Sequence, residues 1–269
     1  MSGSPEKVTV DFASAGDVLI SAQDAKLTSE PATVAKTLIT CTVSLGSILL
    51  LMKILVVDIG GTHVKVASSD HVVPLKIVSG PGMTAQNMVD QVCTATEGWE
   101  YDAISFGYPG PVAKDGPLAE PHNLAAGWVG FSYAQAFPGK QIRFINDAAM
   151  QALGGYRGGR MLFLGIGTGL GSCLIFDGTI VPLELAHLPY RNGRTYEQYI
   201  GLAGLERRGK KAWRKSVLKI VALLRAATVC DSVLLGGGNA KLMKKIPKGT
   251  SCGANSNAIQ GGFALWATS

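Results

Sequence analysis

The chain has 269 residues, of which 47% are apolar and 34 are glycine, and its formal net charge is +6. This composition excludes a chain too polar to build a core, and the length allows one large domain or two small ones. A sequence pI near 9.1 indicates anionic partners without naming one. The five cysteines are scattered with no CxxC pair, which argues against structural zinc and predicts reduced thiols in the cytoplasm.

Residues 1–51 differ in character from the rest of the chain. The run 37–52 carries no charge, but it is shorter than the roughly 20 residues that a membrane span needs. Lys36 precedes the run, yet no small-residue cleavage site follows it, so a secretory signal is not predicted. We expect Met52 to be the working start, residues 1–51 to be a non-native or disordered extension, and a membrane partner to be absent.

From Met52 onward, short apolar runs alternate with glycine turns and with segments of helical spacing. The apolar runs predict strands over 53–60, 63–70, 102–112 and 141–147, a hairpin over 159–181, and a strand, a glycine turn and a helix start over 232–246. Apolar residues at helical spacing predict helices over 84–99, 148–156, 212–227 and 254–267.

Strands followed by helices in both halves of the chain predict an α/β protein. Each half also contains a glycine-rich turn between strands, so we expect two lobes, 52–147 and 148–269, that face a central cleft. The last predicted helix closes the fold by packing on the core, and the first lobe is a candidate place for it.

The stretch DIGGTHVK puts a glycine pair between two predicted strands. Gly60 and Gly61 can adopt positive φ, so their backbone N–H groups can turn toward an anion. Thr62 adds a hydroxyl group, Lys65 adds a cation, and Asp58 adds a carboxylate placed to hold Mg²⁺ through water. The same residues also suit an ordinary Gly-Gly hairpin, so this turn alone does not establish a phosphate site.

Two further glycine turns, GIGTGLG and LLGGGNA, follow in the second half of the chain. A lone threonine lies between the glycines of the first, and a flat ligand could approach the backbone of the second closely. The candidate phosphate- or nucleotide-binding residues of these turns are Gly167, Thr168, Gly169, Gly236, Gly237, Gly238 and Asn239. Three such turns in this order favour a phosphate-binding protein.

The three turns resemble the phosphate-1, phosphate-2 and adenosine segments of the sugar kinase, actin and heat-shock ATPase superfamily. The stretches MKILVVDIGGTHVKV, INDAAMQALGGYRGGRMLFLGIGTGLGS and YEQYIGLAGLERRGKKAWRK are similar to ROK (repressor, ORF, kinase) sugar kinases, and in particular to polyphosphate glucokinases. The likeness runs from Met52 to the C-terminus and leaves residues 1–51 unmatched. It implies a two-lobed actin-like ATPase (ribonuclease H-like) fold, Mg²⁺ as the cofactor and a homodimer.

The stretch INDAA places Asn146 and Asp147 at the end of a predicted strand, directly before a helix. A sugar kinase needs a carboxylate that accepts the proton of the attacking hydroxyl group. The resemblance implies that Asp147 is this base and that Asn146 binds a sugar hydroxyl group. The alternative is that Asp147 only caps the N-terminus of the following helix.

The stretch ELAH puts Glu184 and His187 three residues apart. The resemblance assigns both side chains to sugar hydroxyl groups, with Glu206 as a further sugar-contacting carboxylate and Asn123 in the same pocket. A metal site at this pair is the alternative, but no thiolate lies nearby in the sequence to complete it. The zinc-binding CxCGxxGC segment of many ROK proteins is also absent.

Seven lysines and arginines lie between Arg207 and Lys219 with no acidic residue among them. On a helix most of them lie opposite the apolar stripe that begins at Trp213, which is also how a solvated helix face looks. However, neighbouring like charges repel each other on a helix. A linear phosphate chain binds favourably to a row of cations, because the binding releases its counterions. We therefore interpret Arg207, Arg208, Lys210, Lys211, Arg214 and Lys215 as part of a polyphosphate track, to which Lys241, Lys244, Lys245 and Lys248 add charge.

These observations predict an enzyme that transfers a terminal phosphoryl group from inorganic polyphosphate, with ATP as a second candidate donor, to the 6-hydroxyl group of glucose. A strictly ATP-dependent glucokinase or mannokinase is the rival within the same class. A sugar-sensing ROK repressor would need an N-terminal helix-turn-helix, for which residues 1–51 give no pattern. A polyphosphate- or nucleic-acid-binding protein without turnover would not need Asp147. We expect no nucleic-acid partner.

Overall fold

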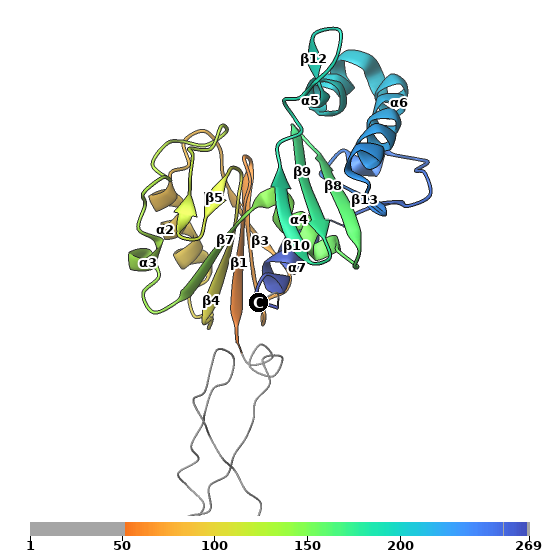
Figure 1. Cartoon of the computed structure of the whole chain (residues 1–269). Helices are drawn as coiled ribbons and strands as arrows, with labels where there is room; N and C mark the ends of the chain where they lie inside the picture. The colour runs from red at the N-terminus through yellow and green to blue at the C-terminus, as the bar shows by residue number, and fades with distance from the viewer. Residues whose placement is uncertain (1–51, 255, 268–269) are drawn as a thin grey trace, which may run out of the picture. The chain divides into compact units, whose positions relative to one another are not determined.

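The structure is a computed structural model and describes residues 52–254 and 256–267. The predictions made for residues 1–51 lie outside the described residues. From Lys53 onward the chain forms two five-stranded mixed sheets, with helices around and between them (Figure 1). The predicted α/β architecture is confirmed.

The first sheet combines an antiparallel meander with parallel strands, in the order β3-β2-β1-β4-β7. The strands are β1 (Ile54–Ile59), β2 (His63–Ser68), β3 (Leu75–Val78), β4 (Ala103–Tyr108) and β7 (Gln141–Asn146). β1 pairs antiparallel with β2 and parallel with β4, and β4 pairs parallel with β7. All residues of β1 and β4 are buried, as is typical of central strands covered on both faces.

The second sheet repeats this topology in the order β10-β9-β8-β13-β14. The strands are β8 (Arg160–Ile166), β9 (Leu170–Phe176), β10 (Thr179–Leu183), β13 (Ser232–Gly236) and β14 (Thr250–Cys252). β8 pairs antiparallel with β9 and parallel with β13, which pairs parallel with β14. The β1–β2 and β8–β9 turns therefore occupy equivalent places in the two sheets.

A long helix packs on one face of each sheet. In the first sheet, alternate residues of β1 such as Leu55 and Val57 share a core with α2 (Ala85–Ala95). In the second, α6 (Leu202–Thr228) buries the predicted apolar stripe from Trp213 to Leu224 against β8 and β13. Within the described part of the chain, no helix is both long and apolar enough to cross a membrane.

The helices α4 (Asp147–Gly155) and α7 (Asn257–Ala264) lie between the two sheets (Figure 1). They pack closely at Gly154 and Gly261, where a Cβ atom on either residue would collide with the backbone of the other helix. α7 also contacts the first sheet, because Ser105 Oγ donates a hydrogen bond of 2.6 Å to the carbonyl oxygen of Gly262. The C-terminal helix therefore contacts both α4 and the first sheet.

Short elements complete the described fold. They are β5 (Val112–Ala113), β6 (Gly116–Pro117), α3 (Tyr133–Ala136), β11 (Pro189–Arg191), β12 (Arg194–Thr195), α5 (Tyr196–Ile200) and the 3₁₀ turn η1 (Ala240–Leu242). The sequence pattern predicted neither these elements nor β3 and β14, because each has at most five residues, too few to produce a readable hydrophobic period.

Besides α2 and α7, which are up to four residues shorter at an end than predicted, two helix predictions differ more strongly from the structure. α6 begins at Leu202 and not at residue 212, because its first part continues through a break at Gly209, whose φ of 69° is left-handed. The helix start predicted after the third glycine turn is only η1. There the carbonyl oxygen of Leu242, which a continuing helix would use, accepts a hydrogen bond of 2.6 Å from Arg214 Nε.

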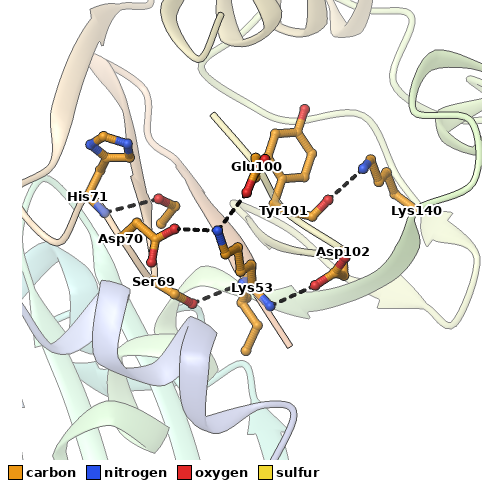
Figure 2. Close-up of polar contacts among 10 residues, drawn as sticks. Lys53, Ser69, Asp70, His71, Glu100, Tyr101, Asp102 and Lys140 are labelled. Carbon is orange, nitrogen blue, oxygen red and sulfur yellow. Dashed lines mark hydrogen bonds and ion pairs between the residues drawn. The ribbon is translucent and has the colours of Figure 1, made fainter. Parts of the chain in front are cut away.

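The edge of the first sheet at which β1 begins is closed by a polar cluster around Lys53 (Figure 2). Lys53 Nζ lies 2.7 Å from a carboxylate oxygen of Glu100 and 3.0 Å from one of Asp70. Its backbone N–H donates to Asp102 at 2.9 Å. These carboxylates already have a cationic or backbone partner. We therefore look for the ligand site at the opposite edge of the sheet, where β1, β4 and β7 end.

Candidate functional site

The carboxyl ends of β1, β4 and β7 bring the first group of predicted site residues together. In the pairing register Asp58 is opposite Gly107, and the next residue of β4, Tyr108, is opposite Asn146. Gly107 has no side chain, and a Cβ atom there would lie 3.6 Å from Asp58 Oδ1. Ligands of open α/β sheets bind at this edge of parallel strands, so Asp58 and Asp147 are well placed to face one ligand.

Asp147 is the first residue of α4, but it is not the helix cap. The cap is Asn146, whose side-chain oxygen accepts hydrogen bonds of 3.1 Å from the N–H groups of both Ala148 and Ala149. Asn146 Nδ2 lies 3.3 Å from the carbonyl oxygen of Gly110. The capping alternative raised for Asp147 therefore applies to its neighbour.

The surroundings of Asp147 raise the pKa of its carboxyl group. Although the residue keeps some exposure to solvent, burial raises the pKa of Asp147 to about 7, and the negative charge of Asp58 adds to the rise. The N–H group of Ala148, which donates to Asp147 Oδ1 at 2.7 Å, and the cation of Lys65 lower the pKa in part. A carboxyl group that titrates near neutral pH can exchange protons with a substrate.

The first glycine turn is tight and its charged side chains are paired. The N–H group of Gly60 donates to the carbonyl oxygen of His63 at 3.1 Å, and a Cβ atom on Gly60 would lie 2.9 Å from that oxygen. Lys65 Nζ lies 2.7 Å from the buried carboxylate of Asp58. Asn123 packs on Gly61, where an added Cβ atom would lie 3.2 Å from Asn123 Cβ. Thr62 belongs to the same turn.

The second and third glycine turns lie against each other. Asn239 joins them, because its backbone N–H donates to Ile166 at 3.0 Å and its Nδ2 donates to the carbonyl oxygen of Gly167 at 2.9 Å. Gly237 has a φ of 77°, and a Cβ atom there would lie 2.7 Å from the backbone of Ile166. The predicted residues Gly167, Thr168, Gly169, Gly236, Gly237, Gly238 and Asn239 therefore form one backbone-lined corner.

The helix α4 brings this corner close to Asp147. A Cβ atom on Gly171, just past the second turn, would lie 2.8 Å from Ala148 Cβ. Ala148 directly follows Asp147. The proposed base and the second turn are therefore neighbours in space although they are about 20 residues apart in the sequence.

Glu197 is a candidate site residue that the sequence analysis missed. Its carboxylate accepts a hydrogen bond of 3.0 Å from the N–H group of Leu170, and a Cβ atom on Gly169 would collide with it. The only local signal is the capping box formed by Thr195 and Gln198 at the start of α5, which fixes the helix N-terminus and not the role of Glu197.

The predicted sugar ligands are only partly brought together. His187 Nε2 lies 3.6 Å from Glu184 Oε1, and both side chains are exposed. This pair lies close to Glu197, whose N–H group donates to the carbonyl oxygen of Ala186 at 3.1 Å. Glu206 is exposed on the first part of α6, and its side chain has no hydrogen bond or ion pair to another described residue.

The basic segment divides into two kinds of side chain. Three arginines are engaged within the fold: Arg207 donates to the carbonyl oxygen of Gln198 at 2.7 Å, Arg208 contacts Ser216 Oγ, and Arg214 binds the carbonyl oxygen of Leu242. The other three predicted residues are Lys210, Lys211 and Lys215, which are exposed and form no ion pair with a described residue. The hydrogen bond from Arg214 places α6 beside η1, which contains Lys241.

Two cavities of the described unit lie away from these residues. One, of about 640 Å³, is lined by residues such as Val221, Arg225 and Thr250 at the far end of α6. The other, of about 380 Å³, lies beside β7 and contains Phe144 and Trp266. Neither is lined by a predicted site residue, and the candidate site is defined here by contacts and strand register.

The residues near Asp147 suit a magnesium ion held mainly by its substrate. Asp58 and Asp147 are two interacting carboxylates at the ends of β1 and β7, which flank β4 in the sheet, and Mg²⁺ is commonly held by one or two carboxylates together with substrate phosphates and water. No group of three or more potential metal-ligating side chains occurs among the residues that the structure describes. The donor set therefore fits Mg²⁺ but does not form a complete cage.

The duplicated sheets and the paired helices between them define the two-lobed actin-like ATPase fold of ROK sugar kinases, as the sequence predicted. A polyphosphate/ATP-glucomannokinase from an Arthrobacter strain superposes with a TM-score of 0.67 at 20% identity, over 80% of this chain and 98% of that one. A ROK family glucokinase from Streptomyces griseus, in complex with glucose and AMPPNP, gives a TM-score of 0.61 at 17% identity, over 78% and 98% of the two chains.

The sequence itself is similar to polyphosphate glucokinase from Mycobacterium tuberculosis, with 26% identity over 162 residues. This match covers 55% of the chain, which spans 60% of the length of that relative. No family model matches the chain. The predicted resemblance to ROK sugar kinases and polyphosphate glucokinases is confirmed.

Proposed function

We propose that this chain is a glucokinase that transfers a phosphoryl group from inorganic polyphosphate to the 6-hydroxyl group of glucose. The observation that carries this proposal is the position of Asp147. Its carboxyl group has a pKa of about 7, interacts with the pair formed by Asp58 and Lys65, and directly precedes the residue that contacts Gly171. A base beside two glycine turns is what transfer of a phosphate to an alcohol requires.

In the proposed reaction, Asp147 accepts the proton of the glucose hydroxyl group as its oxygen forms a bond to the terminal phosphorus. The bond from that phosphorus to the rest of the donor breaks, and the shortened donor leaves. The backbone of the two turns lines the phosphates, with Gly60 and Gly167 in equivalent places. Because the N–H groups of these two glycines donate to His63 and Gly169, the hydrogen bonds to the phosphates come from other N–H groups of the turns. Mg²⁺, when bound near Asp58 and Asp147, would offset the charge of the phosphates.

The acceptor side is proposed to include Asn123, Glu184, His187 and Glu197. Buried sugar hydroxyl groups need a hydrogen-bond partner each, and carboxylate and amide groups supply them. Glu197 joins this set because its carboxylate contacts the second turn, and Glu206 remains a further proposed sugar-contacting carboxylate. Asn146 would serve the site mainly by fixing the start of α4.

Polyphosphate is the proposed donor because of the exposed lysines beside the third turn and because a relative of this chain is named polyphosphate glucokinase. Each unit of a linear polyphosphate carries about one negative charge, so a row of cations favours a long chain over a single nucleotide. ATP is the second candidate donor, since one solved structure is named a polyphosphate/ATP enzyme. A strictly ATP-dependent glucokinase or mannokinase is the alternative proposal.

A two-donor assay tests the proposal directly. The purified chain is incubated with Mg²⁺, with glucose or mannose, and with either nucleotide-free polyphosphate or ATP, and hexose 6-phosphate is measured. We expect product from polyphosphate and glucose. Product from ATP alone would favour the ATP-dependent alternative, and no product with either donor would contradict the kinase proposal. A cytoplasmic homodimer remains the expected form of the enzyme.

A further inference from the structure

The loop 120–129 carries Asn123 to the first glycine turn without help from regular secondary structure. It connects β6 to α3 and contains neither a helix nor a strand. A loop of this kind has few backbone partners of its own, so its shape depends on contacts from outside or on side chains within it. Such a contact must fix the position of Asn123 against Gly61.

Glu120 closes this loop with both oxygens of its carboxylate. Oε2 accepts a hydrogen bond of 3.1 Å from the N–H group of Trp128, and Oε1 accepts one of 3.1 Å from the N–H group of Val129. These hydrogen bonds, with that from Trp128 foremost, lower the pKa of Glu120, so the group is a carboxylate at neutral pH. The two ends of the loop are thereby held together.

Other contacts anchor the neighbours of Asn123 but not Asn123 itself. Leu124 is buried in the first core, and the N–H group of Ala125 donates to the carbonyl oxygen of Met83 at 3.1 Å. Before the loop, the hydroxyl group of Tyr108 donates to the carbonyl oxygen of Ala119 at 2.9 Å. Asn123 is left exposed, with its Cβ atom beside Gly61. The closure by Glu120 adds to these contacts, because it joins the two ends of the loop that carries Asn123.

We infer that Glu120 is a positioning residue for the acceptor side: by closing the loop 120–129 it holds Asn123 beside Gly61, where Asn123 meets the hexose. This inference rests on the proposed function, because it gives Asn123 a hexose to bind. Glu120 itself touches no reacting atom and acts only through the loop. Its loss should weaken hexose binding while the chemistry at Asp147 continues.

Steady-state kinetics with glucose test this role. We expect Glu120→Gln to raise the KM for glucose about tenfold while kcat changes less than about threefold, because the loss falls on ground-state binding. The matched control is Asp115→Asn, which removes an equal charge from an exposed residue between β5 and β6 that makes no hydrogen bond to a described side chain. The control should leave both constants unchanged.

A double-mutant cycle separates positioning from a general structural effect. If Glu120 acts through Asn123, the variant carrying both Glu120→Gln and Asn123→Ala should have the same KM as Asn123→Ala alone, within about twofold. Multiplied effects of the two substitutions would overturn the inference, since Glu120 would then act by another route. An unchanged KM in Glu120→Gln would also overturn it.

Amide hydrogen exchange provides a readout that does not depend on turnover. We expect the N–H groups of Trp128 and Val129 to exchange faster in Glu120→Gln than in the wild type or in Asp115→Asn. If the wild type phosphorylates no hexose, the proposed function fails, and faster exchange would still establish that Glu120 closes the loop. Unchanged exchange at both amides would contradict the closure itself.

Discussion

The two lobes have the same strand order but carry different chemistry. In the first, charged side chains stand at the strand ends, with Lys65 Nζ 2.7 Å from Asp58 and Asp147 close enough for their charges to interact. In the second, the equivalent turn contains only glycines, one threonine and apolar residues, and its carboxylate, Glu197, comes from α5. One scaffold therefore holds a cluster of interacting charged side chains in one lobe and a backbone-lined corner in the other.

The two turns are supported in similar ways. Each closes on itself, through the hydrogen bond from Gly60 to His63 in the first and from Gly167 to Gly169 in the second. Each is also bound by another segment: Ser79 Oγ donates to the carbonyl oxygen of Gly60, and Asn239 Nδ2 donates to the carbonyl oxygen of Gly167. The difference lies in the charged side chains, which belong to the first lobe, so we expect changes there to affect chemistry most and changes in the second lobe to affect folding and donor binding.

The largest expected effect is the loss of the base in the first lobe. Asp147→Asn keeps the size of the side chain but removes its ability to accept a proton, so kcat should fall by about 10²–10⁴-fold. The KM for glucose should change little, and circular dichroism should show an intact fold. A variant that keeps wild-type kcat would mean that the charged strand ends of the first lobe are not catalytic.

The pH dependence of turnover is a second test of Asp147 as the base. Because burial and the charge of Asp58 raise the pKa of Asp147 to about 7, kcat/KM should decrease about tenfold per pH unit below that value and level off above it. For stability the sign is opposite. The folded chain holds this proton more tightly than the unfolded chain, so the stabilisation is full below about pH 4 and is lost as pH rises through about 7.

Activity profiles and urea unfolding measured from pH 5 to pH 9 check both signs, with Asp147→Asn as the control. In this variant the part of the unfolding free energy that falls with rising pH should disappear. A wild-type profile with no change in slope near pH 7 would show that another group limits the reaction.

In the second lobe the expected effect is on folding. Gly237→Ala puts a Cβ atom at a residue with φ of 77° and 2.7 Å from the backbone of Ile166, which cannot move aside easily. The free energy of unfolding should fall by about 1–3 kcal/mol. Gly238→Ala is the matched control, because no atom lies within 4 Å of the added Cβ, and it should change stability by less than about 0.5 kcal/mol. Equal urea midpoints for the two variants would contradict the close packing of the second and third turns.

The features of the two lobes that the sequence could predict are the local ones. Glycine turns between strands and a carboxylate at a strand end are visible in adjacent residues, so the sequence alone predicts both turns and the place of Asp147. The burial of the α6 stripe follows from its spacing in the same way.

The remaining features depend on contacts between distant segments. Glu197 reaches Leu170 from 27 residues away, and Arg214 reaches Leu242 from 28 residues away. No pattern of neighbouring residues encodes such pairs. The same limit explains why the sequence pattern assigns Arg207 to a polyanion track although its guanidinium group binds the backbone of Gln198.

The smallest expected effect concerns the exposed lysines of the second lobe. Replacing Lys210, Lys211 and Lys215 together by glutamine should raise the KM for polyphosphate about fivefold at low salt, and the difference should shrink as salt is added, because exposed charges are screened. The KM for glucose and kcat should stay the same. The control replaces three exposed lysines of the first lobe, Lys76, Lys114 and Lys140, and should have no effect on either substrate. If the KM for polyphosphate rises equally in both variants, the chain responds only to net charge, and the basic face of α6 is a solvated surface and not a donor track.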